Sequence, residues 1–176
     1  MLQDDHRFLH RAIDLDKEAC QLGNDPFGAV LVLNGVIVHE ALDRSVELSD
    51  PTYHAESAVI AEYCRSHHLF SLEGYSLYAS TEPCVMCSGA IHWARISRVV
   101  FSVSQAMLQE ITGGRPKPGC SDILNAGHRT IEVVGPLLTE EGLAALVGYS
   151  ETLSRIERHR KRFSTDYDSA SPFDNP

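Results

Sequence analysis

Four residues of this sequence have the types and spacing needed for metal-assisted chemistry. Cys84 and Cys87 form a Cys-x-x-Cys motif, and His54 and Glu56 form a His-x-Glu motif that begins thirty residues upstream of Cys84. One imidazole and two thiolates supply three protein ligands to a zinc ion and leave its fourth tetrahedral position open for water. Structural zinc sites usually close with four protein ligands. The two motifs therefore favour a catalytic zinc site on His54, Cys84 and Cys87.

Glu56 has a different expected role from the three ligands. Side chains two residues apart on a helix point away from each other, so Glu56 is badly placed to bind the same ion as His54. Its carboxylate can instead carry protons to and from the activated water. The alternative is a redox-active or simply buried Cys-x-x-Cys pair in a reducing compartment. That alternative leaves the His-x-Glu motif unexplained.

Two helices must bring these residues together. Capping residues at 50–52 predict a helix over residues 54–66, whose first turn carries His54 and Glu56. A strand over residues 72–80 should lead directly into a second helix that carries both cysteines and ends near residue 95. Pro83 suits the first position of that helix, where its missing N–H costs nothing. The positive end of the helix favours the thiolates.

Periodicity and turn signals predict the remaining elements. Helices are expected over residues 4–22, 121–126 and 139–162. Strands are expected over residues 28–33, 36–40, 99–103 and 130–134, with a hairpin turn at residues 34–35. The order of strand, helix and strand around the cysteines predicts a parallel crossover. Ligands in such sheets bind beyond the carboxyl ends of the strands.

Length and composition fit one compact domain. The chain has 176 residues, of which 43% are hydrophobic and 22% charged. We expect residues 1–162 to form a single zinc-dependent domain. The polar residues 163–176 should form a tail whose spaced aromatics could cap the site. Residues 113–120 should form a mobile loop, either a lid or a connector.

Charge and cysteine content restrict the partners and the compartment. The net charge of −9 disfavours nucleic acid as a partner, and a basic cluster at residues 155–162 also suits the end of a helix. The odd count of five cysteines indicates a reducing compartment. No stretch resembles a signal peptide or a membrane span, so we expect a cytoplasmic protein with no membrane partner.

Residues from about 4 to 162 resemble the cytidine deaminase-like superfamily, in its branch of guanine, fungal-type cytosine and tRNA adenosine deaminases. The matching segments are PFGAV at 26–30, DPTYHAE at 50–56, EPCVMCSGAI at 82–91 and WAR at 93–95. The resemblance implies an α/β fold, a three-layer α/β/α sandwich around a five-stranded mixed sheet, and usually a homodimer. It also implies zinc on His54, Cys84 and Cys87, with Glu56 as the proton shuttle.

The resemblance further implies a set of substrate-binding residues. In the family, a backbone N–H beside the metal turn fixes the base, which corresponds here to Ala55. Phe27 and Trp93 match ring-packing positions of guanine deaminases, although both could equally belong to the core. Asp43 stands where these deaminases usually carry an asparagine that binds the base. The other interpretation of Asp43 is that it points to solvent or pairs with Arg44 or another cation.

The expected function is zinc-dependent hydrolytic deamination of a free purine, pyrimidine or related amino-heterocycle. The segments at 26–28 and 93–95 favour a guanine-type purine, whereas residues 121–162 look more like cytosine or tRNA adenosine deaminases. Deamination of cytosine or cytidine, or of adenosine in tRNA, is therefore the alternative. A non-catalytic zinc protein is the remaining class, and the presence of Glu56 speaks against it.

Overall fold

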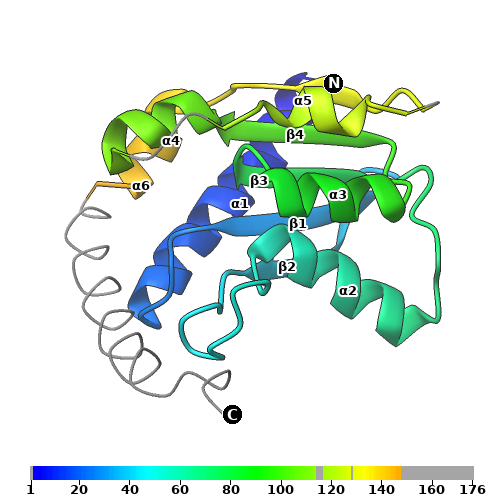
Figure 1. Ribbon diagram of the computed structural model, residues 1–176, viewed down its shortest axis with the longest axis horizontal. Coiled ribbons are helices and arrows are strands. Elements are labelled where there is room, and N and C mark those ends of the chain that lie inside the picture. Colours follow the sequence, from blue (N-terminus) through cyan, green and yellow to red (C-terminus); the bar gives the residue numbers. More distant parts are fainter. Residues whose placement is uncertain (1, 114–116, 128, 148–176) are drawn as a thin grey trace, which may run out of the picture.

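The computed structural model describes residues 2–113, 117–127 and 129–147 (Figure 1). The sheet has five strands, β1 (Gly28–Leu33), β2 (Val36–Leu42), β3 (Ser76–Thr81), β4 (Arg98–Val103) and β5 (Glu132–Val134), in the order β2-β1-β3-β4-β5. β1 is antiparallel to both of its neighbours, whereas β3, β4 and β5 are parallel to one another. The predicted mixed sheet and its parallel crossover are therefore confirmed.

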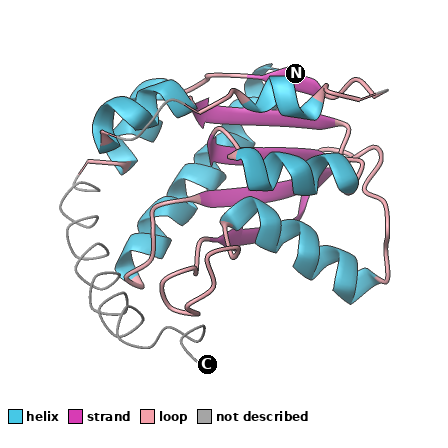
Figure 2. Cartoon of the chain, in the orientation of Figure 1, coloured by secondary structure: helices cyan, strands magenta, loops and turns pink. Residues whose placement is uncertain are grey.

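Helices cover both faces of the sheet (Figure 2). One face packs against α1 (Leu2–Gln21) and α6 (Thr139–Ala145), and the other against α2 (Ala55–His67), α3 (Val85–Trp93) and α5 (Cys120–Leu124). A further helix, α4 (Gln105–Thr112), follows β4. The three-layer α/β/α architecture matches the expectation. Among the described residues, no helix is long and apolar enough to cross a membrane.

Alternation along the strands divides the apolar side chains between two cores. In β1, Ala29 and Leu31 pack towards α2 and α3, whereas Val30 and Val32 pack towards α1. Strand β4 lies two places from β1 in the sheet. Its residues from Val99 to Val103 are 0–5% exposed, as expected for a strand that is buried on both faces. Two-sided burial holds β3 and β4 rigidly, and the metal-binding turn follows β3.

A buried ion pair ties α1 to the far end of the sheet. The Arg98 guanidinium contacts the Asp5 carboxylate at 2.7 Å, and the Tyr78 hydroxyl donates to the same carboxylate at 2.7 Å. Burial alone would raise the pKa of Asp5, but the hydrogen bonds from Arg98 and Tyr78 outweigh it and hold that pKa below its usual value. The ionised form of Asp5 therefore stabilises the fold.

Several predicted boundaries differ from the structure. The strand expected over residues 72–80 starts only at Ser76, because Gly74 adopts a positive φ of 88° and closes a turn in which Tyr75 N–H donates to Leu72. Helix α4 was not predicted, although Ser104 caps it by accepting a hydrogen bond from Met107 N–H. His54 and Cys84 are N-cap residues, so His54 and Pro83 precede their helices and do not belong to the first turns.

Some predictions fall outside the described residues. The structure describes only the first part of the segment expected to be helical over residues 139–162. In this part α6 ends at Ala145, and a turn follows. The basic cluster at 155–162, the domain boundary at 162 and the tail at 163–176 lie outside the described part of the chain, as do residues 114–116 of the expected loop.

Candidate active site

The ligand-bearing segments meet at one edge of the sheet. Strand β3 ends at Thr81, and the chain passes through Glu82 and Pro83 to Cys84, the N-cap of α3. His54 occupies the equivalent N-cap position of α2, with its carbonyl accepting from Ala58 N–H at 2.9 Å. Two helix N-termini therefore converge here, and their positive ends favour thiolate and carboxylate groups.

A polar network fixes the segment before His54. The Tyr53 hydroxyl donates to the Glu62 carboxylate on α2, and His39 Nε2 on β2 lies 2.9 Å from the other oxygen of Glu62. On the main chain, Arg44 N–H donates to the Tyr53 carbonyl at 3.2 Å. Residue 53 is thus held by both α2 and the loop after β2, which restricts the position of the imidazole that follows.

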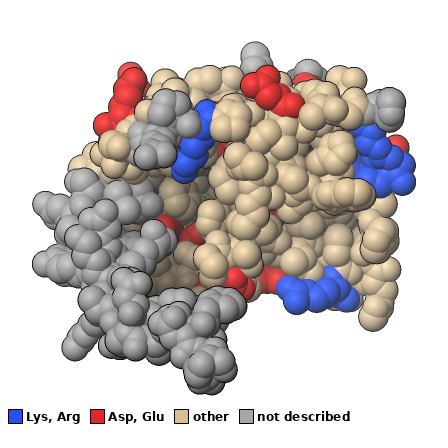
Figure 3. Space-filling view, in the orientation of Figure 1, with Lys and Arg blue, Asp and Glu red and all other residues tan. Residues whose placement is uncertain are grey.

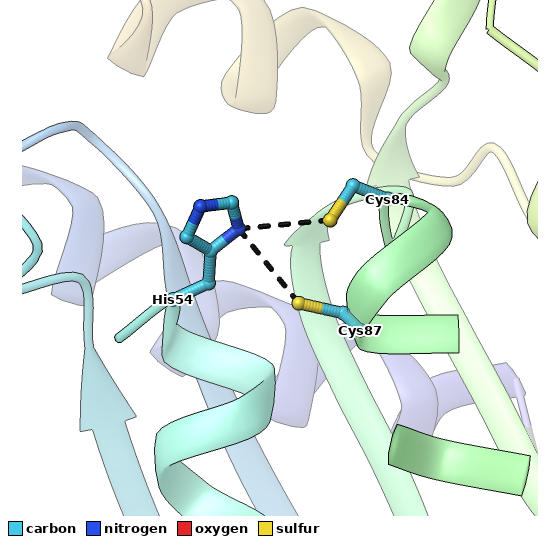
Figure 4. Close-up of side chains that lie close together, drawn as sticks. All are labelled: His54, Cys84 and Cys87. Carbon is cyan, nitrogen blue, oxygen red and sulfur yellow. Dashed lines mark hydrogen bonds between the residues drawn. The ribbon is translucent and has the colours of Figure 1, made fainter. Parts of the chain in front are cut away.

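Figure 4 shows the three predicted ligands facing one another. His54 Nδ1 lies 3.6 Å from Cys84 Sγ and 3.8 Å from Cys87 Sγ. All three ligand atoms lie within 4.8 Å of one another, and no other metal-binding group of this kind occurs among the described residues. The structure therefore brings together the ligands that the motif spacing predicts.

These distances fit a zinc ion. With metal–sulfur bonds of about 2.3 Å and metal–nitrogen bonds of about 2.0 Å, tetrahedral coordination places nitrogen and sulfur ligands about 3.6 Å apart. The observed separations of 3.6 and 3.8 Å lie within a few tenths of an ångström of this value. The nitrogen and sulfur donors are also those that zinc prefers.

Hydrogen bonding among the ligands shifts their proton affinities. A hydrogen bond from the Cys87 thiol, supported by one from His54, lowers the pKa of Cys84 to about 3 against the opposing effect of burial. The hydrogen bond with Cys84 raises the pKa of His54 to about 9, again against burial, and the charges of Glu56 and Asp43 add to the shift. Metal binding consequently displaces the protons of His54 and Cys87.

Glu56 lies next to the ligands on the first turn of α2. Its side chain is 7% exposed, and the Cys87 thiol donates to Glu56 Oε2 at 3.6 Å. Burial and the negative charge of Cys84 raise the pKa of Glu56 to about 7. A carboxyl group with this proton affinity can accept and release a proton near neutral pH.

A pocket of about 270 Å³ opens beside Glu56. Its lining includes His54 and Cys84, so the predicted chemistry faces this space. The remaining lining residues come from the loop before β1, the end of β3, and the segment from α4 onward: Asp25, Phe27, Thr81, Glu82, Gln105, Leu108, Thr112 and Lys117. The pocket therefore lies beyond the carboxyl ends of β3 and β4, as the topology predicts.

The four predicted substrate-binding residues have different positions. Phe27 lines the pocket, and Ala55 is a fully buried residue at the start of α2. Asp43 is 1% exposed, so it does not point to solvent; its Oδ1 accepts from Ser45 N–H at 2.9 Å and from the Ser45 hydroxyl at 2.6 Å. Trp93 does not line the pocket. It is 82% exposed at the far end of α3, which excludes the core as its position in this chain.

Several residues that line the pocket were not predicted from the sequence. Gln105, Leu108 and Thr112 lie on the unpredicted helix α4, whose capping serine and apolar spacing were the available signals. Asp25 precedes Pro26 in a loop, and Glu82 precedes the Cys-x-x-Cys motif. Neither acidic residue carries a local pattern that distinguishes a pocket-lining carboxylate from a solvated one.

Comparison with known proteins agrees with this geometry. Residues 2–103 match the family model described as "Cytidine and deoxycytidylate deaminase zinc-binding region". A probable cytosine deaminase of Schizosaccharomyces pombe is 35% identical over 84% of this chain and 93% of its own length. A tRNA-specific adenosine deaminase of Bacillus subtilis is 35% identical over 92% of this chain and 98% of its own length.

A solved structure extends the comparison to a third substrate. The X-ray structure of guanine deaminase from Bacillus subtilis is 32% identical, covers 83% of this chain and 93% of its own, and superposes with a TM-score of 0.59. The names of these three relatives thus give three different substrates.

Proposed function

Because this chain belongs to the cytidine and deoxycytidylate deaminase family, we propose that it deaminates a free purine, pyrimidine or related amino-heterocycle, foremost a guanine-type purine. Family members are hydrolytic enzymes that act on carbon–nitrogen bonds, and this chain shares that reaction class. The observation that carries the proposal is the buried carboxyl group of Glu56 beside three zinc ligands in the lining of a small pocket.

The residues of the chain divide the reaction between them. His54, Cys84 and Cys87 would hold a zinc ion, which would supply a Lewis acid that makes water reactive near neutral pH. Glu56 takes one proton from the attacking water and delivers it to a ring nitrogen, and then takes the second proton from the new hydroxyl group and delivers it to the leaving amino group. Water provides the new oxygen, the exocyclic carbon–nitrogen bond breaks, and ammonia leaves.

The size and charge of the pocket support a free heterocycle as the substrate. Its volume of about 270 Å³ is slightly smaller than the roughly 300 Å³ at which the usual range of ligand pockets begins. Asp25, Glu56 and Glu82 line it, and Lys117 is the one cationic side chain in its described lining other than the metal ligand His54. A phosphate group would meet mainly like charge here. This balance favours a neutral base or nucleoside over a nucleotide.

The acceptor-rich lining also supports a guanine-type purine. Carboxylates accept hydrogen bonds and do not donate them, so Asp25 favours a ring edge that presents N–H or amino groups. Guanine presents such donors beyond the amino group that is lost. Phe27 supplies an aromatic surface in the same pocket on which a purine ring can stack.

Deamination of cytosine, or of adenosine in tRNA, is the second candidate function. The observation in favour is the 35% identity to both the Schizosaccharomyces pombe and the Bacillus subtilis proteins over most of their length. The net charge of −9 weighs against a polyanionic substrate, because nucleic-acid binders usually present a clustered basic surface.

The outer face of α3 supports assembly into a homodimer. Figure 3 shows that the surface over α3 carries few acidic or basic side chains, whereas some of both kinds lie at the lower edge over α2. Trp93 and Val85 on α3 are 82% and 52% exposed, and a Cβ atom on Gly89 between them would meet nothing within 4 Å. An exposed apolar helix face of this kind is typical of a protein interface. We propose that a second copy of the chain covers it.

An ammonia-release assay tests the proposed function. The panel should contain guanine, guanosine, adenine, adenosine, cytosine, cytidine and ammeline, with a tRNA transcript alongside. We expect release from a free heterocycle, foremost guanine. The Glu56→Ala variant should keep its zinc and its fold but lose turnover by at least about a hundredfold. Activity on the tRNA transcript alone would overturn the proposal, as would a Glu56→Ala variant within tenfold of the parent.

A further inference from the structure

The carboxylate of Glu82 bridges two segments that are far apart in the sequence. Its Oε2 accepts a hydrogen bond from Gln105 N–H at 2.8 Å, and its Oε1 accepts one from Cys120 N–H at 2.7 Å. These donors are the first residues of α4 and α5. Glu82 is 8% exposed, so both bonds form where water competes poorly.

Two further hydrogen bonds attach Glu82 to the end of β4 and to the start of α4. Glu82 N–H donates to the Val103 carbonyl at 2.7 Å, and the Gln105 side-chain amide donates to the Glu82 carbonyl at 2.6 Å. Only Pro83 separates Glu82 from the ligand Cys84. One residue therefore joins the metal-binding turn to the segment that follows β4.

That segment supplies one side of the pocket. We call Gln105, Leu108, Thr112 and Lys117 the distal wall, because they line the pocket from the elements that follow β4. Gln105 is itself one of the two donors that Glu82 binds, and the other three lie in the sequence between it and the second donor, Cys120. Glu82 thus holds both ends of the distal wall against the turn that carries Cys84.

We propose that Glu82 is a positioning residue that fixes the distal wall relative to the metal ligands and thereby sets the affinity for substrate. This inference rests on the proposed function of the pocket. Hydrogen bonds to a charged acceptor are about twice as strong as neutral ones and fix geometry more tightly. Without them the distal wall moves outward, whereas His54, Cys84 and Cys87 keep their mutual contacts.

The Glu82→Gln variant removes this clamp with a minimal change of shape. A glutamine has one acceptor oxygen and one amino group at the positions of the two carboxylate oxygens. Its amino group must therefore face either Gln105 N–H or Cys120 N–H, a donor opposite a donor, and that bond is lost. Glu110→Gln is the matched control, since it makes the same chemical change at an exposed position on α4 itself.

Hydrogen exchange and steady-state kinetics on the zinc-loaded protein form the test. In Glu82→Gln we expect at least tenfold faster exchange of one of the two amides, that of Gln105 or that of Cys120, whichever faces the new amino group. KM should rise by roughly tenfold, with kcat and zinc content close to those of the parent. Glu110→Gln should change none of these quantities. A merely structural role would lower thermal stability without separating KM from kcat.

A second variant tests the same contact from the other side. A Cβ atom on Gly119 would lie 3.3 Å from Glu82 Oε1, so Gly119→Ala displaces the carboxylate by a few tenths of an ångström. We expect a rise in KM of a few-fold, since misplacement by about 1 Å can cost about a hundredfold. This variant decides the question if Glu82→Gln does not fold.

The outcomes separate this inference from the proposed function. Unchanged exchange at Gln105 and Cys120, or unchanged KM in Glu82→Gln and Gly119→Ala, would overturn the role of Glu82. If the parent protein deaminates no heterocycle, the proposed function fails, and the exchange rates still show whether Glu82 clamps the two helices.

Discussion

Burial gives Glu56 a proton affinity that the residue type alone would not have. An exposed glutamate is ionised near neutral pH, whereas 7% exposure and the neighbouring Cys84 bring the pKa of Glu56 to about 7. At the same scale, one hydrogen bond separates the properties of two cysteines: the acceptor Cys84 has a lowered pKa, and the donor Cys87 a raised one. A single hydrogen bond or a neighbouring charge thus determines which groups of the site keep their protons.

Asp43 offers a test of substrate recognition at the level of one atom. In Asp43→Asn, the retained carbonyl oxygen can keep the contacts of Oδ1 with Ser45, while the second oxygen becomes a donating amino group. If Asp43 binds the base, preference should move away from donor-rich heterocycles. A polar mismatch in such a site can discriminate by up to about 10⁴-fold. The measurement is the ranking of kcat/KM over the ammonia-release panel, and an unchanged ranking would show that Asp43 does not contact the base.

Individual residues show how far sequence alone could predict this site. His54, Cys84, Cys87 and Glu56 were predictable because their chemistry demands fixed types at fixed spacing within local helical turns. Trp93 was not, since the same aromatic residue suits a pocket, a core or an interface, and only the packing of α3 decides between them. The bridging role of Glu82 could not be predicted for another reason: its hydrogen-bond partners lie 23 and 38 residues away in the sequence.

At the scale of elements, local signals decided which boundaries were predictable. Strand β1 has the predicted bounds because its β-rich run is followed directly by the hairpin turn at residues 34–35. The predicted start of β3 at residue 72 was wrong. Leu72 is fully buried, as a strand residue would be, but Gly74 breaks the extended chain after it. Burial and periodicity indicate what an element packs against, and the positive φ of one residue can still decide where it begins.

The contact between α1 and the sheet should make stability depend on pH. The pKa of Asp5 in the folded protein lies below its usual value of 3.8, so its contribution is complete above that pH and is lost as the pH falls through the folded pKa. Removal of one partner from a buried ion pair costs about 3 kcal/mol. Arg98 keeps its contact with Glu132 Oε1 at 3.1 Å, so we expect Asp5→Asn to lower the free energy of unfolding at pH 7 by less than this, about 2 kcal/mol.

Urea titrations between pH 7 and pH 2 measure this effect. The difference between the parent and Asp5→Asn should shrink as the pH falls below 3.8, because protonation removes the same charge from the parent. Asp14→Asn is the control on the same helix, since its contact with Lys17 is exposed and worth little. A difference that stays constant across the titration would contradict the assigned role of Asp5.

At the scale of the whole molecule, the proposed homodimer depends on the apolar face of α3. The Trp93→Glu variant places a charge on the apolar face of α3, where a second copy would have to desolvate it. We expect the parent to sediment as a dimer and Trp93→Glu as a monomer at micromolar concentration, with an unchanged circular dichroism spectrum. Phe70→Glu is the control, because Phe70 is 98% exposed outside any helix or strand. A monomeric parent, or a dimeric Trp93→Glu variant, would show that this face is not the interface.

The positions of the ligands in the sequence also mean that a bound metal ion closes a loop of the chain. His54 and Cys84 are thirty residues apart, so an ion held by both closes a loop that contains α2 and β3. A covalent cross-link over a loop of this length would be worth about 3–4 kcal/mol of chain entropy. The folded chain already brings the two ligand atoms to 3.6 Å, whereas an unfolded chain would have to lose that entropy to bind the ion at all. Zinc and the native state are therefore thermodynamically linked, and the availability of the metal helps to determine the fraction of chains that stay folded.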